Sequence, residues 1–192
     1  LTVHSTLGLR AVSAAFFPVF HRLGINRIDP SDFTSPPRLN QFLPSWIMVH
    51  CQPFDGLLTQ LEYRAVGAHL LAGRIRIANK TVLPQYLRLD WAGVVNPRDG
   101  GDGLAVTPQG LGHALTASSG GLELVACITG SAQPGKLPWP SLSVTDELYP
   151  GSELSLFWAV AGLPSREDAF RLAQLGLNRP WEAELARLEL TS

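Results

Sequence analysis

The chain has 192 residues, a length that fits a single domain and allows a sizeable buried core. Hydrophobic residues make up 45% of the sequence and charged residues only 16%, which predicts that part of the surface lies against a partner. The basic residues are 13 Arg and 2 Lys, with no basic run that would follow a phosphate backbone, so the sequence excludes nucleic acid as the expected partner.

No apolar run approaches the ~20 residues that a membrane-spanning helix needs, so we expect no membrane partner. The sequence begins at Leu1, and its opening residues lack the charged start of a signal peptide, which favours a processed chain or a fragment. Cys51 and Cys127 form no CxxC pair and are expected to be buried free thiols; a disulfide between them would require an exported protein. The sequence favours neither a secreted nor a cytoplasmic location.

Short apolar segments separated by Gly and Pro are typical of an all-β chain, and they recur at the spacing of a sandwich. We therefore predict a mainly β fold, an antiparallel β-sandwich with two short C-terminal helices. The region 21–45 is rich in Pro, Asp and Ser and is expected to be a long loop. The predicted strands cover residues 46–51, 57–66, 104–108, 113–118, 122–129 and 153–160.

Residues 73–91, GRIRIANKTVLPQYLRLDW, pose a question of their own, because they could build the core or present chemistry. Arg and apolar residues alternate over 74–77 and again up to Trp91, with turn-forming residues between, which predicts a β-hairpin. Trp91 is expected in the core, as is Trp158 in the last strand. Asn79 begins a glycosylation sequon, but we interpret it as a turn residue.

The chain ends in two predicted helices. The first covers about 166–175, with Ser165 and Asp168 resembling a capping box and Gly176 expected to end the helix in a left-handed conformation. The second begins at Pro180. Its stripe at i, i+4 and i+7 must be buried, and we expect it to pack on the sandwich or on a partner. The partner-interface candidates in this stripe are Trp181, Leu185 and Leu188.

The familiar catalytic motifs are absent, among them the nucleophile elbow GxSxG, HExxH and the phosphate-binding loops. The five His residues are scattered, so we expect no metal site and no cofactor. Asp90 projects from the same strand face as Arg88 and is expected to form a surface ion pair. A glycosidase would need two facing carboxyl groups, and no such pair can be placed from the sequence.

Three residues are candidates for ligand binding. Trp139 lies in the loop LPWP, where a core position is least expected, and its ring could pack on a sugar. Asp99 and Asp102 belong to RDGGDG, residues 98–103, which we interpret as a surface turn rather than a calcium site because two carboxylates are too few.

The order of parts gives a resemblance: strands that include RIRIANKTVLPQYLRLDW, then LYPGSELSLFWAVAGL, then helices starting SREDAF and PWEAELARLEL. Over residues 45–190 this layout resembles the amino-terminal β-sandwich (supersandwich) domain, with its helical linker, of glycosidases and phosphorylases whose catalytic domain is an α/α barrel. Glucoamylase-like and cellobiose-phosphorylase-like enzymes are examples. The resemblance implies a sandwich domain at 1–164 and a linker at 165–192.

In those families the catalytic carboxylates lie in the barrel, so the resemblance assigns no catalytic residue to this chain. It implies a non-catalytic part of a carbohydrate-active enzyme, with a helical catalytic domain or chain as partner and carbohydrate as ligand. Whether the chain belongs to an enzyme stays open at this point. Two alternatives remain: a stand-alone module that binds carbohydrate or protein, with Trp139 and residues 98–103 at its rim, and a self-contained hydrolase.

Overall fold

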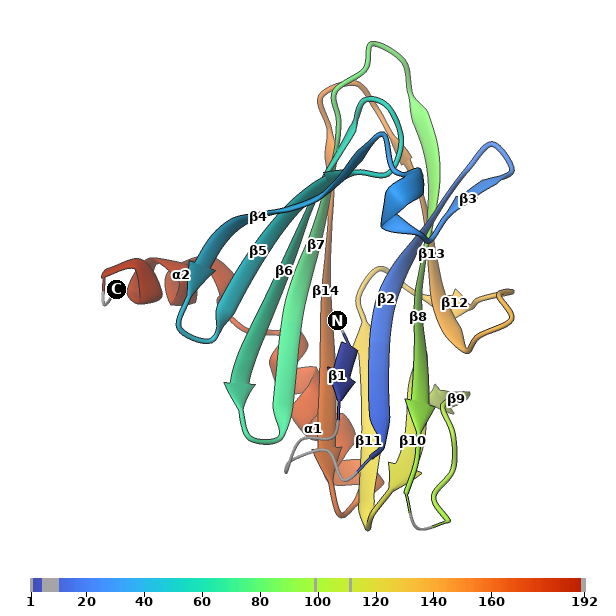
Figure 1. Ribbon diagram of the computed structural model, residues 1–192, viewed down its shortest axis with the longest axis vertical. Helices are drawn as coiled ribbons and strands as arrows, with labels where there is room; N and C mark the ends of the chain where they lie inside the picture. Colours follow the sequence, from blue (N-terminus) through green and yellow to red (C-terminus); the bar gives the residue numbers. More distant parts are fainter. Residues whose placement is uncertain (1, 5–10, 99, 111, 191–192) are drawn as a thin grey trace.

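The computed structural model describes residues 2–4, 11–98, 100–110 and 112–190, which form two antiparallel sheets and two helices (Figure 1). The smaller sheet has the order β1-β2-β8-β13-β12, with β3 paired to β2. Its strands are β1 (Thr2–His4), β2 (Ser13–Arg22), β3 (Ile25–Arg27), β8 (Gln85–Asn96), β12 (Gln133–Pro134) and β13 (Ser141–Leu148). The architecture confirms the predicted antiparallel sandwich.

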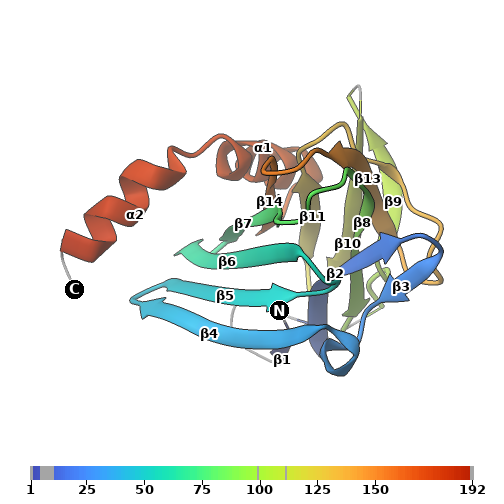
Figure 2. The ribbon, with the colours of Figure 1, turned by 90° about the horizontal axis from the view of Figure 1, so that it is seen from above.

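The larger sheet has eight strands in the order β4-β5-β6-β7-β14-β11-β10-β9. Figure 2 shows β4, β5 and β6 extending away from the smaller sheet, while β14, β11 and β10 lie beside it. Its strands are β4 (Ser35–Leu43), β5 (Trp46–Gln52), β6 (Leu57–Gly67), β7 (Leu70–Asn79), β9 (Ala105–Gln109), β10 (Gly112–Ser119), β11 (Leu122–Ile128) and β14 (Glu153–Leu163).

The hairpin predicted over residues 73–91 is wrong, although both of its strands exist. β7 pairs with β6 and β14 in the larger sheet, whereas β8 pairs with β2 and β13 in the smaller one. The Asn79 side chain explains the crossover, because it is fully buried and donates to the carbonyls of Leu83 and Leu148, 2.8 Å away in each case. The sequon side chain is therefore committed to a turn between the two sheets.

The region 21–45 is not the predicted long loop. It contains the end of β2, the strand β3, a 3-10 turn at Pro30–Asp32 and the strand β4. β4 ends the larger sheet, and its register on β5 shifts between Ser35 and Arg38, where Pro36 and Pro37 lie. An edge strand tolerates proline because one row of its amide groups needs no ladder partner, so a Pro-rich sequence forms a strand here.

The core between the sheets contains a chain of aromatic rings in contact with one another. Trp91 lies 5.4 Å from Phe16 and 5.5 Å from Trp158 between ring centroids, and Tyr63 lies 5.7 Å from Trp158. Trp91 and Trp158 are both buried, which confirms their predicted place. A Cβ atom on Gly73 would fall 2.1 Å from the Trp158 ring, so glycine lets that ring lie directly on the β7 backbone.

A second apolar layer covers the outer face of the larger sheet. Helix α1 (Arg166–Leu177) places Ala169, Ala173 and Gly176 against β14, β11 and β7. A Cβ atom on Gly176 would lie 2.9 Å from the Cβ of Ala159, so small residues on both elements allow the close approach.

The ends of α1 agree with the sequence at one end only. Ser165 is the N-cap, and its hydroxyl accepts from the amide of Asp168, as predicted. Gly176 lies inside the helix rather than ending it in a left-handed conformation. Asn178 is the C-cap, with φ −96°, so burial against the sheet rather than backbone freedom explains the glycine.

Both cysteines are free and buried, as expected, but on different faces of the larger sheet. Cys51 belongs to the core between the sheets, and Cys127 to the layer under α1. Burial raises the pKa of each thiol from 9.0 to about 12, because the thiolate would lose its hydration. Burial also raises the pKa of Tyr63 from 10.0 to about 12.

We expect these groups to make the fold alkali-sensitive. Both thiols ionise near pH 9.0 in the unfolded chain but near pH 12 in the folded one, so their contribution is complete below pH 9 and is lost as the pH rises toward 12. Each should cost about 1.4 kcal/mol of unfolding free energy per pH unit above 9. Urea unfolding at pH 8, 9 and 10 measures the slope, to which Tyr63 adds only as the pH approaches 10.0, its value in the unfolded chain.

The control is the double variant Cys51→Ala, Cys127→Ala. Its stability at pH 8 should be lower, because two buried side chains are shortened, and its slope between pH 9 and 10 should be much shallower. Equal slopes for the variant and the parent chain would contradict the assignment.

Candidate functional site

A polar row crosses the outer face of the smaller sheet, the face turned away from the core. The strand registers place Asn26, His21, Arg88 and Thr145 opposite one another on β3, β2, β8 and β13. Their neighbours along the strands, such as Leu87 and Leu89, belong to the core between the sheets. Because side chains alternate along a strand, the four polar residues share the opposite face.

Asp90 lies in the next row of this face and is fully buried. Its Oδ2 is 2.6 Å from Nε2 of His21 and 3.3 Å from Nε of Arg88. Nη2 of Arg88 lies 2.9 Å from Nδ1 of His21. Oδ1 of Asn26 lies 2.5 Å from the same nitrogen, so Nδ1 of His21 faces both a donor and an acceptor. Asp90 therefore pairs with Arg88 as predicted, but the carboxylate is buried rather than on the surface.

The loop between β12 and β13 covers Asp90. A Cβ atom on Gly135 would lie 2.0 Å from Oγ of Ser141 and 3.3 Å from Oδ1 of Asp90, so the loop backbone rests directly on both side chains. Trp139 follows in the same loop, with 36% of its surface exposed and its ring 5.9 Å from the Phe17 ring, edge to face. One part of the indole is thus held by the sheet, and the ligand-binding role of Trp139 stays a prediction.

The other two ligand candidates lie elsewhere. Asp99 is outside the described residues. Asp102 is tied to β10 of the larger sheet, because its amide donates to Oγ of Ser118 at 2.9 Å and its carbonyl accepts from the Ser118 amide at 3.1 Å. These bonds account for Asp102 as a loop anchor, and its ligand role also stays a prediction.

A hollow beside Arg88 was not predicted from the sequence. It lies between β8, the β11–β13 connection and β13, and most of its lining side chains are hydrogen-bond donors. Lys136 is one of only two lysines in the chain, which is the single sequence signal that could have singled it out. The lining side chains that matter below are those of Arg88, Ser131, Gln133, Lys136, Ser143 and Thr145.

The three interface candidates lie on helix α2 (Trp181–Leu190), which crosses the outer face of the larger sheet. Trp181 is buried, with its ring 5.1 Å from the Trp46 ring and 6.2 Å from the Phe157 ring. Leu185 and Leu188 are partly buried in the same apolar layer. The stripe packs on the chain's own sheet, as one of the two expected arrangements requires, and its part in a contact with another domain remains a prediction.

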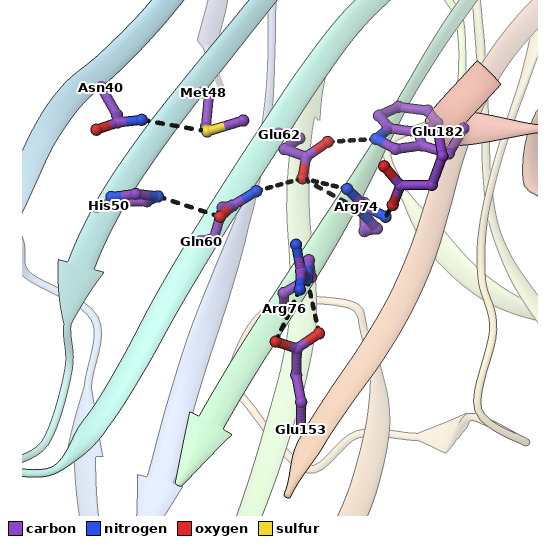
Figure 3. A network of polar contacts seen from close by, with 10 residues as sticks. Asn40, Met48, His50, Gln60, Glu62, Arg74, Arg76, Glu153 and Glu182 are labelled. Carbon is purple, nitrogen blue, oxygen red and sulfur yellow. Dashed lines mark hydrogen bonds and ion pairs between the residues drawn. The ribbon is translucent and has the colours of Figure 1, made fainter. Parts of the chain in front are cut away.

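A buried ion cluster fixes the start of α2. Figure 3 shows Glu62 facing Arg74 across the β6–β7 pair, with Gln60 beside it. Oε1 of Glu62 accepts from Nη2 of Arg74 at 2.8 Å and from Nε at 3.1 Å, and its Oε2 accepts from the indole N–H of Trp181. Glu182 pairs with the same guanidinium. Trp181 and Glu182 are thereby bonded to fixed positions on the sheet.

Two further contacts hold the rest of α2. Arg64 on β6 pairs with Glu184, and the amide of Gln41 on β4 donates to Glu189 at 3.1 Å. The helix is therefore attached from β7 to the edge strand β4. In contrast, the pair of Arg76 and Glu153 on the same face is about one-third exposed on each side (Figure 3).

Among the described residues, no three His, Cys, Asp or Glu side chains gather as a metal site would require. Within the same part of the chain, no helix has the length and hydropathy to cross a membrane.

The fold was compared with known proteins. No family model matches the sequence. No curated protein matches it either. Among solved structures, a putative kojibiose phosphorylase from the human microbiome is 9% identical, with a TM-score of 0.54, over 90% of this chain and 27% of the phosphorylase. A polysaccharide lyase is 13% identical, with a TM-score of 0.52, over 82% of this chain and 27% of the lyase. A heparinase III product is 8% identical, with a TM-score of 0.47, over 78% and 24%.

At these identities the likeness concerns the fold alone. The two structures with TM-scores above 0.5 are a glycoside phosphorylase and a polysaccharide lyase, both carbohydrate-active enzymes, and this chain has the sheet-rich architecture of an amino-terminal sandwich domain. This agrees with the resemblance found in the sequence. The chain spans about a quarter of the length of each of these enzymes.

We expect Glu62→Gln to loosen α2. The change keeps the shape of the side chain but leaves Arg74 buried without its main counter-charge, and breaking a buried pair costs about 3 kcal/mol or more. Urea unfolding measures the loss, and hydrogen exchange of the α2 amides locates it. The matched control is Glu153→Gln on the same face, where an exposed pair is worth at most about 1 kcal/mol. Equal losses for both variants would contradict the proposed attachment.

Proposed function

We propose that this chain is the non-catalytic β-sandwich portion of a glycoside hydrolase, packing against a helical catalytic domain and helping to shape its sugar site. The observation that carries the proposal is the pair of folds with TM-scores above 0.5, a phosphorylase and a polysaccharide lyase, in which the matched part is about a quarter of a longer enzyme. Residues 1–164 would form the sandwich domain and residues 165–192 the helical linker.

The state of the buried acids supports a non-catalytic role. Glycoside hydrolysis needs two carboxyl groups that flank an accessible bond. Glu62 and Asp90 are both fully buried, and each is engaged with an arginine of its own sheet. Neither can reach a glycosidic oxygen without breaking the pair that holds it.

The apolar surface supports a partner. Leu175 on α1 and Leu190 on α2 are 62% and 88% exposed, although both helices already bury an apolar face on the sheet. Leu39 and Phe42 on β4 are 65% and 69% exposed. Such residues beside a helical linker are what a second domain would cover.

We expect the 192-residue chain alone to hydrolyse no glycoside, because the paired carboxylates would belong to another domain. A screen on α- and β-linked glucosides, run beside the complete product of the same gene, measures this. Turnover by the longer product only would support the proposal. Turnover by the short chain that disappears when one of its own Asp or Glu residues is changed would overturn it.

A second candidate function is a stand-alone carbohydrate- or protein-binding module. The half-exposed indole of Trp139 favours it, since ring faces pack well on sugars and the Phe17 ring already orients this one. A true module would bind without a catalytic partner, which separates the two functions.

In that case Trp139→Ala should reduce oligosaccharide affinity at least tenfold, because truncating a Trp that anchors a binding site costs about 2 kcal/mol or more. Calorimetry against a panel of neutral oligosaccharides measures the change. Tyr149→Ala is the control, since Tyr149 is another exposed aromatic, 59% exposed, on a different turn. Unchanged affinity in the Trp139 variant would remove that residue from the site.

A further inference from the structure

The hollow beside Arg88 brings together donors that the fold itself does not use. Nη1 of Arg88 makes no hydrogen bond within the described part of the chain, and neither do the hydroxyls of Ser143 and Thr145 or the ammonium of Lys136 with any described residue. Arg88 and Thr145 are a directly opposed cross-strand pair, and Ser143 is the next outward residue on β13. The side chains therefore open on one space from two adjacent strands.

Arg88 is held in position before any ligand arrives. Its Nε lies 3.3 Å from the buried Asp90 carboxylate, and its Nη2 lies 2.9 Å from Nδ1 of His21, which is itself 6% exposed. The Arg88 side chain is 39% exposed, so one edge of its guanidinium is fixed by these contacts while Nη1 is left for a ligand. Preorganised donors of this kind lose little conformational entropy on binding.

The rim of the hollow has an unusual backbone. Ser131 has φ +53° and follows Gly130 with φ +91°. A non-glycine residue in the left-handed region is uncommon and is enriched at functional positions. Ser131 and, further along, Lys136 line the same hollow as Arg88.

The charges favour an anion. Arg88 and Lys136 contribute two positive charges to the lining, and no Asp or Glu is among the lining residues. Asp90 lies beneath, paired with Arg88. The partly buried Glu147 belongs to the next row, opposite Tyr86, and raises the pKa of Tyr86 by hydrogen bonding to its phenol. It also accepts a hydrogen bond from the Tyr149 hydroxyl.

An exposed aromatic ring lies on the other side of Arg88. Tyr86 is 63% exposed and lines a second hollow together with His21, Leu23 and Gly24. Arg88 and Thr145 line both hollows, so one ligand can reach from the ring to the cations. An aromatic platform beside a cation and several hydroxyls suits a polyhydroxylated ring that carries an oxyanion.

We propose that the outer face of the smaller sheet binds an acidic saccharide. Its carboxylate or sulfate group lies between Arg88 and Lys136, with the hydroxyls of Ser143 and Thr145 as further donors, and its ring lies toward Tyr86. The saccharide part rests on the proposed function, but the anion site rests only on the geometry above.

Calorimetry with the 192-residue chain tests this with four probes: digalacturonic acid, a sulfated disaccharide, a neutral disaccharide and inorganic sulfate. We expect binding of the acidic disaccharides, weakened severalfold between 50 and 500 mM salt. Lys136→Gln should weaken it about tenfold, because a charge-assisted hydrogen bond is lost. Lys80→Gln is the matched control, since Lys80 is the other lysine of the chain and is also exposed.

The variant Tyr86→Ala distinguishes the contribution of the aromatic ring from that of the anion site. It should weaken the disaccharides about tenfold and leave inorganic sulfate unchanged, whereas Lys136→Gln should weaken both. Acetylation of Lys136, read by mass spectrometry against Lys80, should slow when digalacturonic acid is present. The two acidic disaccharides distinguish a carboxylate site from a sulfate site.

Binding of none of the acidic probes, or equal losses for Lys136→Gln and Lys80→Gln, would overturn the anion site. Binding of inorganic sulfate but of neither acidic disaccharide would overturn the proposal that the ligand is a saccharide. Both results differ from a failure of the proposed function, which would appear as glycoside turnover by the isolated chain.

Discussion

The strands β7 and β14 must be covered on both faces, and the rest of the structure follows from this constraint. Their inner face carries Ile75, Ile77 and Leu156 toward the smaller sheet, and their outer face carries Ala72 and Ala159 toward the helices. A two-sheet sandwich covers the first face only. Helix α1 covers the second, and it can do so at close range because small residues meet small residues at the contact.

Helix α1 contacts the outer face of the larger sheet through apolar residues, whereas α2 contacts it largely through polar and charged ones. Glu62 and Arg74 lie on the same outer face as the apolar layer, and Trp181 meets both kinds of neighbour, since its ring packs on Trp46 while its N–H bonds to Glu62. Desolvating such an ion pair cancels much of its attraction, so its net stabilisation of the fold is small. The ion pair instead fixes the position of the helix. The indole N–H of Trp181 and the carboxylate of Glu182 reach Glu62 and Arg74 in one placement of α2 only, whereas an apolar contact alone would allow several.

The sequence predicted what depends on local periodicity and missed what depends on pairing. Alternation identified the strands at 57–66, 113–118 and 153–160, and the Ser165 cap identified α1. Alternation carries no information on the partner of a strand, so β7 and β8 were paired with each other although Leu154 of β14 lies opposite Ile77 and Val144 of β13 lies opposite Leu89. The same limit explains Asp90, because His21 is distant in sequence and only the β2–β8 register brings it there.

The position of β4 at the sheet edge explains why the region 21–45 was wrongly predicted as a loop. The outer faces of the two sheets also differ from each other. Pro36 and Pro37 read as loop residues because proline interrupts a ladder, yet at the sheet edge the missing amide costs nothing. On the larger sheet the outer polar side chains largely satisfy one another or bond to α2. Neither of the two described helices covers the smaller sheet, where Arg88 is held from below by its ion pair with Asp90 and its contact with His21. The smaller sheet thus fixes one edge of the Arg88 guanidinium and leaves the other edge toward solvent. The fold itself therefore maintains the geometry of a binding surface before any ligand is present.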